Sequence, residues 1–268
     1  MRKNQLFLLL AVTALVGFLF YKGYKTPTAS IAKSSIASKE FDFNDYLNTA
    51  SQKLDSVSKV KLEAIGNNAK DTLALQRKIV LWDSAGYSFI AAHYLHDLAE
   101  IMQDERTWFA AGSKFYMLAA SESDSLIATR AAIEAKHALE KVIKINANNL
   151  DAKNALAACY IEVDQDVMKG VSLLKEVVET DSNNIQAIYT LGMLSVQSNQ
   201  LEKAKERFEK LIRLQPFNAE YYFYLAEIYA KTGDTPTAIK TYEKCKTLLT
   251  DKEAKKEVDT IIKKLKNI

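Results

Sequence analysis

Residues 191–216, with the sequence LGMLSVQSNQLEKAKERFEKLIRLQP, give the strongest indication of the fold. A Leu-Gly pair at 191–192 is followed by Ala204, Phe208 and Pro216. Most of this order returns in the next 34 residues, as Leu225-Ala226, Ala238 and Tyr242. Small residues at this spacing let two antiparallel helices approach closely, and the large residues fill the space beside them. The chain is therefore predicted to contain repeated pairs of helices.

Asn-rich junctions divide this part of the chain into three units, 150–184, 185–218 and 219–252. The first unit is looser, with Leu156-Ala157 and then Gly170 three residues before Leu174. Residues 142–149 resemble residues 211–218, so a preceding helix over 125–145 is expected to end like the second helix of a unit. A repeat of fixed length is typical of a solenoid.

These motifs resemble the tetratricopeptide repeat (TPR) family, although no Trp stands at the fourth position of any unit. The resemblance implies an all-α, right-handed α-solenoid of helix-turn-helix repeats. Leu98-Ala99, then Ala111 three residues before Phe115, look like a degenerate earlier unit within an N-terminal helical region at 41–149. Residues 253–268 are expected to form a capping helix with a stripe of apolar residues and many lysines. A patch for anionic lipid or an acidic partner is the alternative for those lysines.

Further helices are predicted between 41 and 149 from apolar residues at three- and four-residue steps. The first runs from Phe43 through Val57 to a stop at Gly66. Asp71 is expected to cap the second, which ends near Gly86. Another helix, over 125–145, shows no internal break.

The run LFLLLAVTALVGFLFY, residues 6–21, contains no charged residue and is flanked by lysines and an arginine. Sixteen helical residues span roughly 24 Å, and flanking residues can extend the helix to the membrane surfaces. We expect residues 1–25 to be an uncleaved transmembrane signal anchor, followed by a Ser- and Thr-rich linker at 26–40. A cleaved secretory signal and a buried helix are the alternatives. The expected location is the inner membrane, single-pass, with the C-terminal domain in the periplasm.

Composition excludes several functions. The chain has 268 residues with only 8 Gly, 3 Pro and 2 Cys, which disfavours all-β folds and disulfide scaffolds. Residues 200–268 carry 15 Lys and Arg against 11 Asp and Glu, too mild an excess for a nucleic-acid partner. Cys159 and Cys245 are interpreted as small buried hydrophobic residues. No cofactor or metal is predicted, and the chain is not expected to be an enzyme.

The TPR resemblance implies a concave groove, lined by the first helix of each unit, that holds a peptide or helix of a protein partner. By unit position its residues are Asn154, Ala158, Ile161, Tyr189, Thr190, Met193, Val196, Phe223, Tyr224 and Glu227. The alternative is that several of these residues simply pack between helices. The positions that hold a carboxylate-binding clamp in chaperone-binding members lack its cations here, so that function is not expected.

The sequence therefore predicts a non-enzymatic interaction scaffold, tethered to the membrane through residues 6–21, that assists assembly of envelope proteins. A structural subunit of a larger envelope complex is the alternative. A metal-dependent enzyme that uses His93 and His96, three residues apart on a helix, is a weaker hypothesis, because the spacing of the zincin motif is absent.

Overall fold

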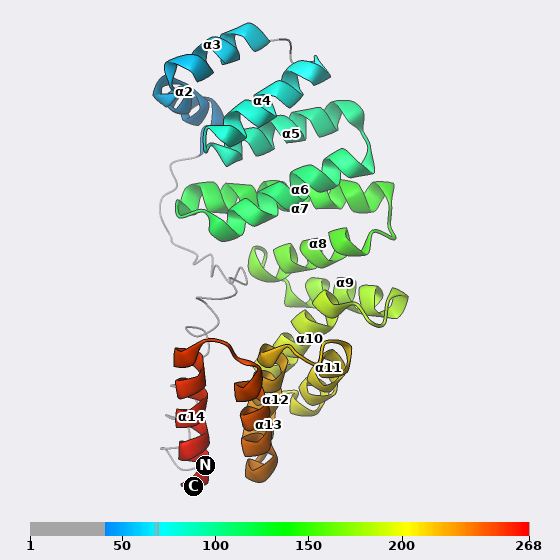
Figure 1. The fold of residues 1–268 in the computed structure, drawn as a ribbon. Coiled ribbons are helices and arrows are strands. Elements are labelled where there is room, and N and C mark those ends of the chain that lie inside the picture. Colours follow the sequence, from blue (N-terminus) through cyan, green and yellow to red (C-terminus); the bar gives the residue numbers. More distant parts are fainter. Residues whose placement is uncertain (1–40, 67, 69, 268) are drawn as a thin grey trace. The chain divides into compact units, whose positions relative to one another are not determined.

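A computed structural model of the protein describes residues 41–66, 68 and 70–267. Every regular element within these residues is an α-helix, which confirms the all-α prediction (Figure 1). The first seven are α2 (Phe43–Lys53), α3 (Ser56–Ile65), α4 (Thr72–Ser84), α5 (Ser88–Met102), α6 (Glu105–Ser121), α7 (Ser125–Ile145) and α8 (Leu150–Glu162). The others are α9 (Val167–Thr180), α10 (Ile185–Gln197), α11 (Leu201–Leu214), α12 (Ala219–Thr232), α13 (Thr235–Leu248) and α14 (Lys252–Lys266).

The described residues divide into two compact units, with the boundary after Leu173 inside α9. The predicted repeat at 150–184 therefore contributes residues to both units. In the N-terminal unit α6 packs along α7, and α5 packs on both α4 and α6. In the C-terminal unit α10 pairs with α11 and α12 with α13, the pairing expected for helix-turn-helix repeats.

The Asn-rich junctions begin helices because their last residue is an N-cap. The side chain of Asn149 accepts a hydrogen bond from the backbone N–H of Ala152 at 2.8 Å. Asn184 caps α10 by accepting from the N–H of Ala187, and Asn218 caps α12 by accepting from the N–H of Glu220. An N-cap side chain satisfies a backbone donor that has no partner in the first helical turn. Helices α8, α10 and α12 accordingly begin at the predicted starts of the three units.

The single helix predicted from Phe43 to Gly66 is wrong. Leu54 is extended, and Asp55 begins a second helix by accepting a hydrogen bond from the backbone N–H of Ser58 at 2.9 Å. The apolar spacing continues across this break, which is why periodicity alone did not reveal it. The capping preference of Asp outweighs the periodicity here.

The core of the C-terminal unit consists of large side chains beside small ones. Gly192 of α10 faces Phe208 of α11, which is fully buried. Ala226 of α12 and Tyr242 of α13 are buried in one cluster in the next pair of helices. These contacts are those that the repeat pattern predicts.

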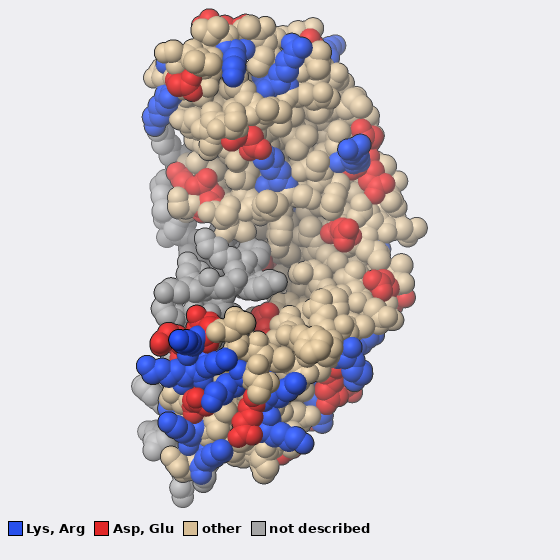
Figure 2. Space-filling view, viewed as in Figure 1, with Lys and Arg blue, Asp and Glu red and all other residues tan. Residues whose placement is uncertain are grey.

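Helix α14 covers the end of this cluster with Val258, Ile261 and Ile262. Its lysines lie on the other side, and Figure 2 shows Lys and Arg side chains gathered over α13 and α14. The arrangement agrees with a terminal capping helix whose outer face is solvated.

The predicted membrane anchor at 6–21 and linker at 26–40 lie outside the described residues. Among the helices that are described, none is both long and apolar enough to cross a bilayer.

Candidate functional site

The predicted groove residues of α8 lie in the N-terminal unit. Asn154 is buried, and Ala158 and Ile161 are half-buried. The side chain of Ile161 lies directly over Gly170 of α9. Asn154 and Ile161 therefore pack between helices, as the alternative interpretation states.

The predicted groove residues of α10 and α12 lie together in the C-terminal unit. The ring of Tyr189 lies 6.1 Å from that of Tyr221 and 6.3 Å from those of Tyr224 and Phe208, measured between centroids. Phe208 and Tyr224 are 5.2 Å apart. Aromatic rings at these distances attract one another through their edges and faces. Tyr189 and Tyr224 are half-buried, so each keeps part of its ring at the surface.

Phe223 does not belong to this surface. Its side chain is fully buried against Tyr242 of α13, with ring centroids 5.4 Å apart. Its assignment to the groove is corrected here: Phe223 is a core residue. Neighbouring residues on a helix point about 100° apart, so Tyr224 can face outward while Phe223 faces the core.

Two carboxylates lie beside the tyrosines, at positions 220 and 227 of α12. The hydroxyl of Tyr189 donates a hydrogen bond to Oε1 of Glu220 at 2.7 Å, and the hydroxyl of Tyr242 donates one to Oε1 of Glu227. Burial raises the pKa of Glu220 and of Glu227, and the tyrosine hydrogen bonds oppose this shift. Burial also raises the pKa of Tyr224 to about 12, so its hydroxyl stays protonated. Both carboxylates retain lone pairs that can accept from a cationic donor.

The remaining predicted residues are on α10. The hydroxyl of Thr190 donates to the backbone carbonyl of Gln186 at 3.0 Å. Met193 and Val196 are partly buried against the Phe208 cluster. We call the following set the tyrosine face: Tyr189, Thr190, Met193, Val196, Glu220, Tyr224 and Glu227.

A second feature was missed by sequence reasoning. A cleft of about 370 Å³ lies on the other side of α10, with an apolar base that includes Ile188 and Leu191. Its rim carries Lys175, Glu179, Glu206, Arg207 and Lys210. The guanidinium of Arg207 is already engaged, donating to the carbonyl of Leu191 at 3.2 Å. No motif marks such a cleft, because it depends on how far apart neighbouring helices lie.

The two cysteines are poorly suited to act as nucleophiles. Cys159 and Cys245 are both free and buried, as predicted. Burial raises the pKa of each thiol to about 12. A thiol with so high a pKa carries almost no thiolate at neutral pH, and the thiolate is the nucleophile.

Comparison with known proteins supports the predicted family over part of the chain. Residues 189–247 match the family model of the tetratricopeptide repeat, so this segment, which contains the whole tyrosine face, carries repeats of that type. FK506-binding protein 59 of Drosophila melanogaster is 33% identical over 82 residues. That alignment covers 31% of this chain and 18% of the relative, so the chain spans less than a fifth of that protein.

Solved structures show the same fold. A MamA protein is similar with a TM-score of 0.55 and 16% identity, over 66% of this chain and 91% of the other. MamA from Desulfovibrio magneticus RS-1 gives a TM-score of 0.54 and 21% identity, over 66% and 94%. YrrB, described as a TPR protein with an unusual peptide-binding site, gives 0.53 and 17%, over 77% and 98%. At these identities the similarity shows a TPR-type α-solenoid and nothing of the ligand.

Proposed function

We propose that this protein is a non-enzymatic interaction scaffold that holds a peptide or helix of a partner protein against the tyrosine face. The observation that carries the proposal is the cluster of half-buried Tyr189 and Tyr224 next to the carboxylates of Glu220 and Glu227. Tyrosine is one of the residue types most enriched among the few side chains that carry most of the binding energy of a protein interface. TPR proteins commonly bind peptides, and YrrB is described as having a peptide-binding site.

The chemistry of the face favours an apolar peptide that carries a lysine or arginine. Met193 and Val196 offer soft apolar surface, which adapts to varied partners. Glu220 and Glu227 lie seven residues apart on α12, and therefore on the same side of the helix. A cation placed beside either carboxylate would stabilise its ionised form, which burial disfavours. A partner carboxylate would be repelled.

A peptide array tests this choice. The full chain is applied to 12-residue peptides with apolar flanks and a central Lys, Arg, Gln or Glu. We expect binding to the Lys and Arg peptides to exceed binding to the Glu peptides by at least about tenfold, and the double variant Glu220→Gln, Glu227→Gln to lose that preference. Equal binding of all four peptide classes would contradict the proposed ligand, and no binding of any class by the wild-type chain would contradict the proposed face.

The proposal also includes a membrane tether. We propose that residues 6–21 form an uncleaved single span of the inner membrane, with the helical units in the periplasm, where the scaffold assists assembly of envelope proteins. The support is the uncharged run with its lysine flanks. Intact-mass measurement of the native protein should find a chain that retains these residues, and a chain beginning near residue 30 would refute the anchor.

A further inference from the structure

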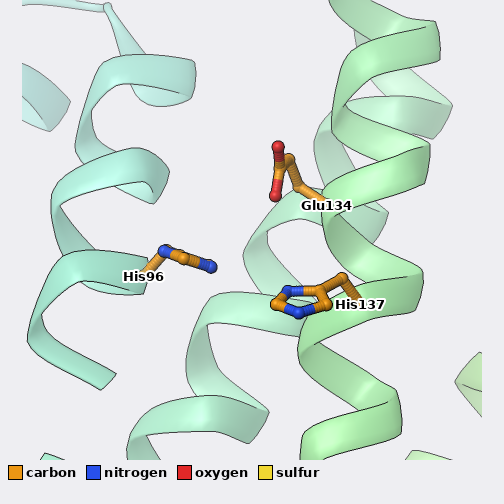
Figure 3. Close-up of side chains that lie close together, drawn as sticks. All are labelled: His96, Glu134 and His137. Carbon is orange, nitrogen blue, oxygen red and sulfur yellow. The ribbon is translucent and has the colours of Figure 1, made fainter. Parts of the chain in front are cut away.

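Two histidines and a glutamate from different helices converge in the N-terminal unit. His96 projects from α5, while Glu134 and His137 project from α7, three residues apart and hence on one side of that helix (Figure 3). One nitrogen of each histidine and one oxygen of Glu134 all lie within 4.8 Å of one another. The side chains of His96 and Glu134 are only 18% and 14% exposed.

Packing holds the two imidazoles in place. The ring of Trp108, on α6, is fully buried and meets His96 at 5.2 Å and His137 at 6.0 Å between centroids, edge to face in both cases. The two imidazoles are 5.8 Å apart. His93, the partner of His96 suggested by the sequence, stacks on Phe43 with 3.6 Å between ring centroids, and its ring lies 6.3 Å from that of His96. The ligand atoms that converge are those of His96, Glu134 and His137, and His93 is not among them.

The charges around this set do not oppose a cation. Arg130 pairs with Glu134 at 2.6 Å, and Lys141 approaches Glu100 at 3.8 Å. A third carboxylate, that of Asp97, lies 3.9 Å from Nδ1 of His96. Among these side chains acidic groups outnumber basic ones by one. Arg130 is 47% exposed and can keep one carboxylate oxygen of Glu134 while the other binds a metal.

From this geometry we propose that His96, Glu134 and His137 bind a divalent transition-metal ion, with Zn²⁺ as the best match. This site is independent of the proposed function of the tyrosine face. Two imidazoles and one carboxylate are a ligand set that zinc accepts, with a fourth position left for water. Mg²⁺ and Ca²⁺ fit this site less well, because they prefer oxygen ligands to imidazole nitrogen. Neighbouring ligand atoms on tetrahedral zinc are about 3.3 Å apart, so rotation of the side chains would close the set.

A bound ion would connect α5 to α7 around Trp108 of α6. Since the unfolded chain does not hold these three ligands together, binding would favour the folded N-terminal unit. The proposal therefore predicts two independent signals, a stoichiometric metal complex and a metal-dependent rise in the unfolding temperature.

The test uses the full chain, stripped of metal with a chelator and titrated with Zn²⁺ against a chromophoric competitor. Co²⁺ serves as a second probe, because its visible absorption reports tetrahedral nitrogen and oxygen ligation. The variants are His96→Gln, Glu134→Gln and His137→Gln, and the matched control is His93→Gln on the same helix as His96. Mg²⁺ is the control ion.

We expect the wild-type chain to bind one Zn²⁺. Its midpoint of thermal unfolding should rise by several degrees with Zn²⁺ but not with Mg²⁺. Each ligand variant should lose at least about 100-fold in affinity for Zn²⁺. His93→Gln should bind as the wild type does. A melting curve of each variant without metal shows whether that variant is folded. The Co²⁺ spectrum of the wild-type chain tests the site without relying on any variant. The proposal is overturned if the wild-type chain shows no stoichiometric Zn²⁺ complex, or if folded ligand variants retain wild-type affinity.

Discussion

Replacing Gly170 by Ala should destabilise the protein, although the same change in most helices stabilises it. Gly170 lies in the first turn of α9 against α8. A Cβ added there would be 2.8 Å from the backbone carbonyl oxygen of Ala157 and 2.5 Å from Cγ1 of Ile161. A side chain can rotate away, but the carbonyl moves only with the backbone of α8. The two other repeat units hold Ala204 and Ala238 at the matching position, so a Cβ is accommodated there but not at Gly170.

The magnitude follows from two opposing effects. Ala in place of Gly in a helix stabilises by about 1 kcal/mol. Overpacking costs about 1–3 kcal/mol, and contact with immobile backbone favours the upper end. The net loss for Gly170→Ala is then about 2 kcal/mol, which lowers the midpoint of thermal unfolding by roughly 4–8 °C.

Gly192→Ala is the matched control. Its new Cβ would lie 3.2 Å from the ring edge of Phe208 and 3.6 Å from Cβ of Arg207, both side-chain atoms. A shift of a few tenths of an ångström relieves these contacts, so the propensity gain roughly cancels their cost. We expect its midpoint within about 2 °C of the wild type. Circular-dichroism melts of the full chain measure both variants. A rise for Gly170→Ala would refute the argument, because it would mean that α8 and α9 separate freely.

Two further predictions concern half-buried carboxyl groups of the N-terminal unit. Burial raises the pKa of Glu162 from 4.5 to about 7. Between these pH values the folded state holds a proton that the unfolded state releases. The free energy of unfolding should therefore fall by up to about 3 kcal/mol as pH rises from about 4.5 to 7. Urea unfolding across this range should show that Glu162→Gln removes this decrease and that the exposed control Glu179→Gln does not; an identical profile for Glu162→Gln would contradict the assignment. Glu105 accepts hydrogen bonds from Nδ2 of Asn149 at 2.7 Å and from Nδ2 of Asn146 at 2.9 Å, so Glu105→Ala should cost about 1–3 kcal/mol in urea unfolding and Glu105→Gln less. Equal losses for these two variants would show that the acceptor oxygen is unimportant.

The helices of the repeats were predictable because local chemistry determines them. Apolar spacing and Asn caps lie within a few residues of the structure that they specify, so the starts of α8, α10 and α12 follow from the junctions ending at Asn149, Asn184 and Asn218. The break at Asp55 was also local, but its capping signal lay inside a continuous apolar pattern.

The candidate sites were less predictable, because they depend on contacts between distant residues. The family geometry located the tyrosine face, yet it did not distinguish Tyr224, which is half-buried, from the fully buried Phe223. Which of two neighbouring residues on α12 faces the core depends on the rotation of that helix about its own axis relative to α13. Spacing along one helix likewise suggested His93 as the partner of His96, whereas His137, 41 residues further along the chain, is the histidine whose ligand atom converges with those of His96 and Glu134.

Site-specific photo-crosslinking in the native cells can show whether the tyrosine face holds a partner protein, because it captures that protein in place, whatever its identity. A benzophenone amino acid is placed in the full chain at Thr190, on the tyrosine face, and in a second chain at Lys203, exposed on α11. We predict a discrete adduct with another protein at 190, none at 203, and a weaker adduct at 190 when Glu220→Gln and Glu227→Gln are added. Equal adducts at both positions, or an adduct at 203 alone, would contradict the claim that the tyrosine face holds the partner.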